Sequence, residues 1–169
     1  MMTAMTRLET HQMDDHYRVA FWSNVALIDI WDDMDAERMR NMGAAYKTLS
    51  ERYPEGIVGL VLLQPSTPVS SAEARHEVTR QMNELGPRLH HVTMVIEARG
   101  VMALMLRSVV RGVNMLLRRS SISLEVSVDS AAHKLRPYLA ADAADGVDGL
   151  LAAVRALRCD DPMHHAQSA

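Results

Sequence analysis

The 169-residue sequence has the length of one domain with tails, and its 48% hydrophobic content is enough for a stable core. A formal net charge of −3 at pH 7 disfavours nucleic-acid binding, and the single cysteine, Cys159, excludes an intramolecular disulfide or a cysteine-rich zinc site. The sequence shows no signal-peptide pattern and no apolar run near the roughly 20 residues that span a bilayer. We therefore expect a cytoplasmic protein with no transmembrane segment and no nucleic-acid partner.

The first predicted elements form a β-hairpin. Residues 1–15 are polar, without sustained periodicity, and are interpreted as a flexible leader. Tyr17–Trp22 and Val25–Trp31 are rich in residues typical of strands. Ser23 and Asn24 lie between them and suit a tight turn, because asparagine tolerates a left-handed backbone. Two antiparallel strands are therefore expected after the leader.

An amphipathic helix is predicted next. Asp32, Asp33 and Asp35 offer carboxylates that cap a helix and favour its N-terminus. The apolar residues that follow recur at spacings of three and four, as on one helix face: Met39, Met42, Tyr46, Leu49 and Tyr53. The segment Pro54–Gly56 ends this helix, because proline cannot continue its hydrogen bonding.

The middle of the chain predicts a buried strand followed by a helix. Ile57–Leu63 is nearly continuous in Val, Leu and Ile, which is typical of a central strand covered on both faces. Gln64–Val69 contains two prolines and is predicted to be a loop. Ser70 and Glu73 form a capping-box pattern, so a helix is expected to begin at Ser70, and Gly86–Pro87 is expected to end it.

The remaining sequence continues the alternation of strands and helices. We predict a strand at His91–Glu97, a helix at Gly100–Arg119, a strand at Ser120–Val128, and a helix that Asp129 or Ser130 caps and that ends at Leu139. The order ββαβαβαβα predicts an α/β fold with a mixed, mostly parallel sheet covered by helices.

Three regions of the chain are distinguished by composition. Residues 1–15 are the leader, and residues 16–140 form the α/β domain. Residues 141–169 comprise an Ala/Asp linker, a short amphipathic helix from Val147 to Leu157 and a disordered polar tail.

The order of elements, with its hairpin start, resembles the STAS domain family of anti-sigma-factor antagonists over roughly Tyr17 to Ala140. In that family a phosphorylatable Ser or Thr begins the helix after the central strand, within an Asp-Ser-Ser-Gly-like motif. The matching segment here is Val69-Ser70-Ser71-Ala72, which keeps the two serines but not the acidic residue or the glycine. The resemblance implies a divergent regulatory or protein-interaction module without an intact phosphorylation motif.

In a mostly parallel sheet, a binding site is expected at the carboxyl ends of the strands, in the loops Gln64–Ser71 and Glu97–Gly100. Both loops lead into helix N-termini, which favour an anion, and Arg99 adds positive charge. The candidate binding residues are Ser66, Thr67, Ser70, Ser71, Glu97, Arg99 and Gly100. The simpler interpretation is that Ser70 only caps its helix and that Arg99 is a solvated surface residue.

The third helix carries a candidate interaction face. Its basic stripe consists of Arg107, Arg111, Asn114 and Arg118, which suits an acidic partner or phosphate groups but also an ordinary solvated face. Leu104 and Met115 flank the stripe, with the small residues Ser108 and Gly112 nearby. This face is expected either to contact a partner or a second copy, as a homodimer, or to pack under the C-terminal helix.

Catalytic and metal-binding patterns are not found in the sequence. The eight histidines lack ligand spacing, so no metal is expected, and no nucleophile elbow, P-loop or dinucleotide-binding turn occurs. Asp29 and Glu97 are the acids on predicted strands, where an exposed strand side would explain them.

The preferred hypothesis is therefore a non-enzymatic regulatory or interaction module with an unidentified protein partner and no cofactor. A small-molecule or anion-binding protein that uses the two loops is the alternative hypothesis. An enzyme of unknown class is the third.

Overall fold

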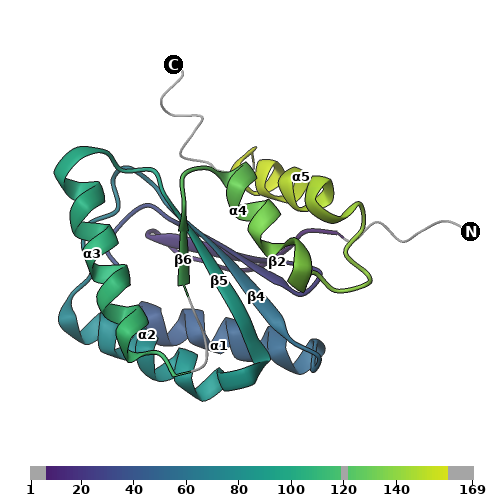
Figure 1. Cartoon of the computed structure of the whole chain (residues 1–169), viewed down its shortest axis with the longest axis horizontal. Helices are drawn as coiled ribbons and strands as arrows, with labels where there is room; N and C mark the ends of the chain where they lie inside the picture. The colour runs from purple at the N-terminus through teal and green to yellow at the C-terminus, as the bar shows by residue number, and fades with distance from the viewer. Residues whose placement is uncertain (1–6, 119–121, 160–169) are drawn as a thin grey trace, which may run out of the picture.

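The computed structural model describes residues 7–118 and 122–159. Within them, six strands lie side by side in chain order (Figure 1). They are β1 (Glu9–Met13), β2 (Tyr17–Trp22), β3 (Val25–Ile30), β4 (Ile57–Leu63), β5 (Leu89–Ile96) and β6 (Ile122–Glu125). The pairs β1–β2 and β2–β3 are antiparallel, whereas β3 to β6 pair in parallel. The predicted α/β class with a mixed, mostly parallel sheet is confirmed.

Helices cover both faces of the sheet. One face is covered by α1 (Ala36–Arg52), α2 (Ala72–Leu85) and α3 (Gly100–Leu116), and the other by α4 (Val128–Leu135) and α5 (Gly146–Cys159) (Figure 1). Short 3-10 turns occupy Gly86–Arg88 and Arg136–Tyr138. Because side chains alternate along a strand, β2 to β5 contribute to two separate apolar cores.

The central part of the sheet matches the prediction from sequence. All seven residues of β4 are buried, because helices cover both of its faces and β3 and β5 flank it. The predicted hairpin is also present as β2 and β3. Its turn differs in one respect, since Ser23 rather than Asn24 adopts the left-handed backbone, with φ 49°.

Asn24 instead joins three segments of the chain. Its Nδ2 donates hydrogen bonds to the carbonyl oxygens of Gly56, at 3.0 Å, and Tyr138, at 2.9 Å. Its Oδ1 accepts a 2.9 Å hydrogen bond from the Ala140 backbone. The side chain therefore holds the β2–β3 turn to the ends of two connections that lie far away in sequence.

The flexible leader predicted for residues 1–15 is wrong over Glu9–Met13, which form the edge strand β1. This strand is mostly exposed, so it lacks the alternation of apolar residues by which strands are predicted. Its pairing with β2 shifts register between Thr10 and Gln12, which makes His11 an extra, bulged residue whose ring stacks on Phe21. Backbone pairing, rather than apolar burial, holds this segment in place.

Two helix starts differ from the prediction. The side chain of Ser71, not Ser70, accepts the capping hydrogen bond of α2, from Ala74 N at 3.1 Å. Ser127 rather than Asp129 or Ser130 caps α4. Neighbouring serines and aspartates offer similar oxygens, so composition alone does not decide which one caps. The prediction of an aspartate cap for α1 is confirmed, with Asp35 as the capping residue.

The C-terminal helix is part of the packed structure. Leu150, Val154 and Leu157 of α5 are buried in the core that α4 shares. This helix and α3 lie on opposite faces of the sheet (Figure 1). The alternative that the outer face of α3 packs under the C-terminal helix is therefore wrong. The predicted tail, Asp160–Ala169, lies outside the described residues.

Candidate functional site

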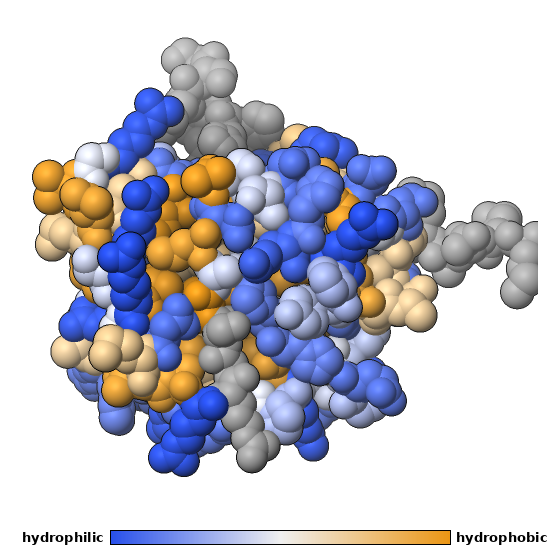
Figure 2. Space-filling view, in the orientation of Figure 1, coloured by the Kyte–Doolittle hydropathy of each residue, from blue (hydrophilic) through white to orange (hydrophobic). Residues whose placement is uncertain are grey.

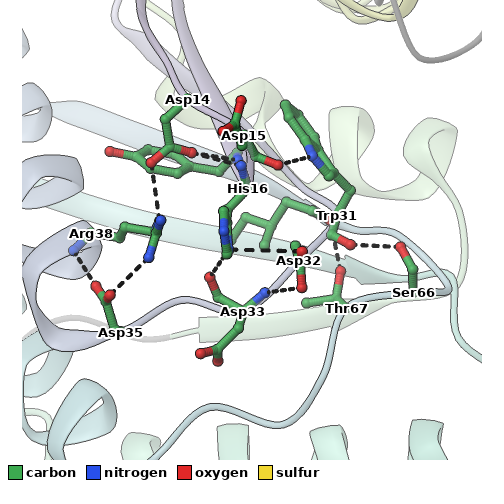
Figure 3. A network of polar contacts seen from close by, with 12 residues as sticks. Asp14, Asp15, His16, Trp31, Asp32, Asp33, Asp35, Arg38, Ser66 and Thr67 are labelled. Carbon is green, nitrogen blue, oxygen red and sulfur yellow. Dashed lines mark hydrogen bonds and ion pairs between the residues drawn. The ribbon is translucent and has the colours of Figure 1, made fainter.

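Polar side chains gather where β3 and β4 end (Figure 3). The Ser66 hydroxyl donates a 2.6 Å hydrogen bond to the carbonyl of Trp31, and the Thr67 hydroxyl donates one of 2.7 Å to the carbonyl of Ile30. These two predicted binding residues thus tie the β4–α2 loop to the end of β3. Their hydroxyl protons are committed to the fold.

The turn between β1 and β2 joins the same network (Figure 3). Trp31 Nε1 donates to the carbonyl of Asp15 at 2.7 Å, and His16 Nδ1 lies 2.6 Å from the carbonyl oxygen of Asp33. Since a carbonyl can only accept, His16 carries a proton on Nδ1. These contacts give the acidic corner, formed by Asp14, Asp15, Asp32, Asp33 and Asp35, a structural role.

Arg38 is the cation that balances this corner. Its guanidinium bridges Asp14, at 3.1 Å, and Asp35, at 2.7 Å. The hydrogen bond from the Arg38 backbone N–H, together with this ion pair, lowers the pKa of Asp35. Arg38 therefore holds both carboxylates.

The two predicted binding loops do not meet in one pocket. Glu97 forms an ion pair with Arg158 of α5, on the α4–α5 side of the sheet. Arg99 is exposed and precedes Gly100, which begins α3 with φ +64°. Ser70 is half-buried, and its carbonyl accepts a hydrogen bond from Arg75. The predicted site residues therefore separate into structural contacts and exposed positions.

A buried charged pair lies at the same edge of the sheet, and the sequence did not identify it. Arg18 and Asp29 are cross-strand neighbours on β2 and β3, only 3% and 0% exposed. Gln64 Nε2 lies 3.1 Å from each carboxylate oxygen of Asp29. Burial is the main cause that raises the pKa of Asp29, and Arg158 and Arg18 act against it. The expectation of an exposed strand side is wrong for Asp29.

Arg18 is under-satisfied in this cluster. Among the described residues, no hydrogen-bond partner faces its buried Nε and Nη2. Burying a cation without its full set of partners costs free energy, so this cluster is not a source of stability by itself.

The outer face of α3 is the largest departure from an ordinary surface. Val101, Leu104 and Met115 are 73%, 62% and 87% exposed, and Met105 and Leu116 are exposed as well. Arg107 and Arg111 run beside them. Figure 2 shows hydrophobic and strongly hydrophilic side chains next to each other over this helix, at the left of the view. We call Val101, Leu104, Arg107, Arg111 and Met115 the α3 face.

Two residues of the predicted basic stripe are used elsewhere. Asn114 accepts from the backbone N–H of Ile122 at 2.8 Å and donates to its carbonyl at 2.7 Å, which fixes the start of β6. Arg118 lies beyond the end of α3, where its backbone N–H donates to Asn83. The stripe predicted from helical spacing is therefore wrong at these two positions.

A shallow groove separates α3 from α2. Small side chains and polar groups form much of it, since it is lined by Ala72, Arg75, His76, Thr79, Ser108, Val109, Gly112, Val113 and Leu116. Ser108 and Gly112 of the predicted close-approach pair thus face α2 across an open groove. The exposed cap Ser71 adjoins its first lining residue, Ala72.

Residues 7–118 and 122–159 contain neither a metal-binding cluster nor a membrane-spanning helix. No three or more His, Cys, Asp or Glu side chains in these ranges are grouped so that they could hold a metal ion. None of the helices described there combines the length and apolar character needed to cross a membrane.

The chain was also compared with known proteins. Family models, curated proteins and solved structures all gave no match to it.

Proposed function

We propose that the protein is a non-enzymatic, STAS-like interaction module, and that the α3 face binds an acidic and partly apolar surface of another protein. The observation that carries this proposal is the exposure of Val101, Leu104 and Met115 on one helix. Val101 and Leu104 lie on adjacent turns, and Met115 lies about three turns further along the same face, beyond Arg107 and Arg111. Exposed apolar side chains that gather on one helix face mark interaction sites.

Charge selects the kind of partner. The sequence of α3 contains no acidic residue, while Arg107 and Arg111 lie beside the apolar side chains. A two-fold contact between two copies of the α3 face would bring these arginines close to one another, which disfavours a homodimer. A partner with Asp or Glu around an apolar centre complements the face better.

Ser70 and Ser71 supply a basis for regulation within the proposal. Ser71 is exposed at the N-terminus of α2, which forms one wall of the groove beside the α3 face. Added negative charge is tolerated at a helix N-terminus and would change the field seen by an acidic partner. We place this activity in the cytoplasm, because a single cysteine suits a reducing compartment. The alternative of an anion site formed by both loops has less support, since Glu97 and Arg99 diverge.

The proposal is tested by site-specific photo-crosslinking in the native cell extract. A photoreactive residue at Leu104 should give one predominant adduct, whereas the same residue at the exposed Val126 should not. The captured protein, once purified, should bind the chain at least about tenfold more weakly after Arg107→Glu with Arg111→Glu, because close charge pairs favour binding.

Two results would contradict the proposal. The first is the same adducts from Leu104 and Val126, and the second is unchanged affinity after charge reversal. Native mass spectrometry of the purified chain should show a monomer, and a stable dimer that Leu104→Glu dissociates would favour self-association through the α3 face.

A further inference from the structure

An apolar cavity of about 120 Å³ lies between the sheet and helices α1, α2 and α3. Methionine side chains contribute much of its wall, including Met39, Met42, Met82 and Met94. Methionine is flexible and adapts its shape to what it contacts. Half-buried Ser70 and Arg75 also line the cavity, below the β4–α2 loop.

One polar group faces this cavity from a deeply buried position. Tyr46 is only 7% exposed, and its hydroxyl makes no hydrogen bond with any described residue. A Cβ at Gly59 would lie 2.1 Å from that hydroxyl oxygen, so the phenol ring passes directly over the glycine of β4. A hydroxyl that the fold does not use can donate a hydrogen bond to a molecule bound in the cavity.

A second polar side chain, Gln81 of α2, also lines the cavity. Gln81 contacts α1 at Gly43, where a Cβ would lie 1.9 Å from Oε1. Gln81 Nε2 donates to Glu77 at 2.8 Å, which leaves Oε1 as an acceptor. Gly43 and Tyr46 are three residues apart on α1 and therefore share one helix face. The cavity thus combines an apolar wall, a hydroxyl and an amide oxygen.

We propose that this cavity binds a neutral, monocyclic molecule of the phenol class. An engineered apolar cavity of about 150 Å³ accepts benzene. This cavity is smaller, about 120 Å³, so a single ring enters only as the flexible methionine side chains move aside. The ligand hydroxyl accepts a hydrogen bond from the Tyr46 hydroxyl. A charged ligand would have to lose its hydration among methionine and valine side chains. This site is separate from the α3 face and does not depend on the function proposed for it.

The test uses the full chain, with p-cresol as probe and toluene as the matched molecule without a hydroxyl. In protein labelled at the methionine methyls, p-cresol should give intermolecular nuclear Overhauser effects to Met42 and Met82. Effects only to Met105 and Met115, on the surface of α3, would overturn the proposal, as would the absence of binding.

Substitution of the hydroxyl supplies the second measurement. Tyr46→Phe should weaken p-cresol binding about tenfold, as expected for one lost hydrogen bond, and should change toluene binding less than about twofold. The matched control Tyr138→Phe, outside the cavity lining, should change neither. Equal affinity of wild type and Tyr46→Phe for p-cresol would overturn the assignment. Circular dichroism establishes that each variant is folded.

Discussion

The two faces of the sheet are packed in different ways. On the α4–α5 face, Leu135, Leu150 and Leu157 are at most 1% exposed. The buried side chains of Arg18 and Asp29 lie beside this core. On the α1–α3 face, methionines surround a cavity and the outermost helix exposes apolar side chains. Dense packing resists deformation, whereas methionine-rich packing adapts. We therefore expect the α4–α5 face to be the more rigid of the two, and the proposed binding sites lie on the α1–α3 face.

The largest expected effect separates the two cores by stability. Leu150→Ala should lower the free energy of unfolding by about 3–5 kcal/mol, because the tightly packed α4–α5 core cannot close around the lost volume. Met82 borders an existing cavity between flexible methionine side chains, so we expect Met82→Ala to lower the free energy of unfolding by only about 2 kcal/mol. Urea unfolding followed by circular dichroism measures both. Equal losses would remove the difference in packing between the faces.

The second prediction concerns the pH dependence of the α4–α5 face. Because burial raises the pKa of Asp29, the folded chain binds a proton there more tightly than the unfolded chain does. This contribution therefore favours folding at low pH and is lost as the pH rises from about 4, the unfolded value, through the folded value. Asp29→Asn should gain stability relative to wild type over that window.

The free energies of unfolding of wild type and Asp29→Asn are measured from about pH 3.5, just below the unfolded value, upward to neutral pH, and their difference is compared. In the Asp29→Asn variant, Gln64 can still donate a hydrogen bond to the side-chain amide oxygen. The variant therefore removes the titrating carboxylate but keeps this hydrogen bond. The matched control on the surface is Asp15→Asn, because Asp15 is exposed. A constant difference across the range would contradict the prediction.

The smallest effect distinguishes the adjacent serines on the α1–α3 face. Ser71→Ala should cost about 1 kcal/mol, because α2 loses its capping hydrogen bond, whereas Ser71→Asp should retain most of the stability. Ser70→Ala should cost less, since the Ser70 contact with Arg75 uses the backbone carbonyl. Thermal unfolding of the three variants tests this order. A larger loss at Ser70 would move the cap to that residue.

Much of the fold could be predicted because apolar pattern and local chemistry agree in it. Ile57–Leu63 is apolar throughout and is fully buried, and Tyr17–Trp22 with Val25–Ile30 form the expected hairpin. The edge strand β1 could not be predicted, because its residues are polar and its place is defined by pairing with β2 rather than by apolar burial. Sequence shows burial patterns more clearly than it shows pairing.

The site was harder to predict because it depends on register and packing. Arg18 and Asp29 become neighbours only through the pairing of β2 with β3, which decides the face on which each lies. The cavity beside Tyr46 requires three helices to be placed on the sheet. Arg107 and Arg111 were found from helical spacing, but Asn114 was not separable from them until its bonds to Ile122 were known.

The bulge at His11 has a consequence for the behaviour of many copies together. In the described part of the chain, no strand pairs with the outer edge of β1, so its backbone N–H and C=O groups are free to template another strand. The register shift twists this edge, and the side chains of β1 that point to solvent are mostly polar. Addition of a further strand at this edge, and with it fibril growth, is therefore disfavoured.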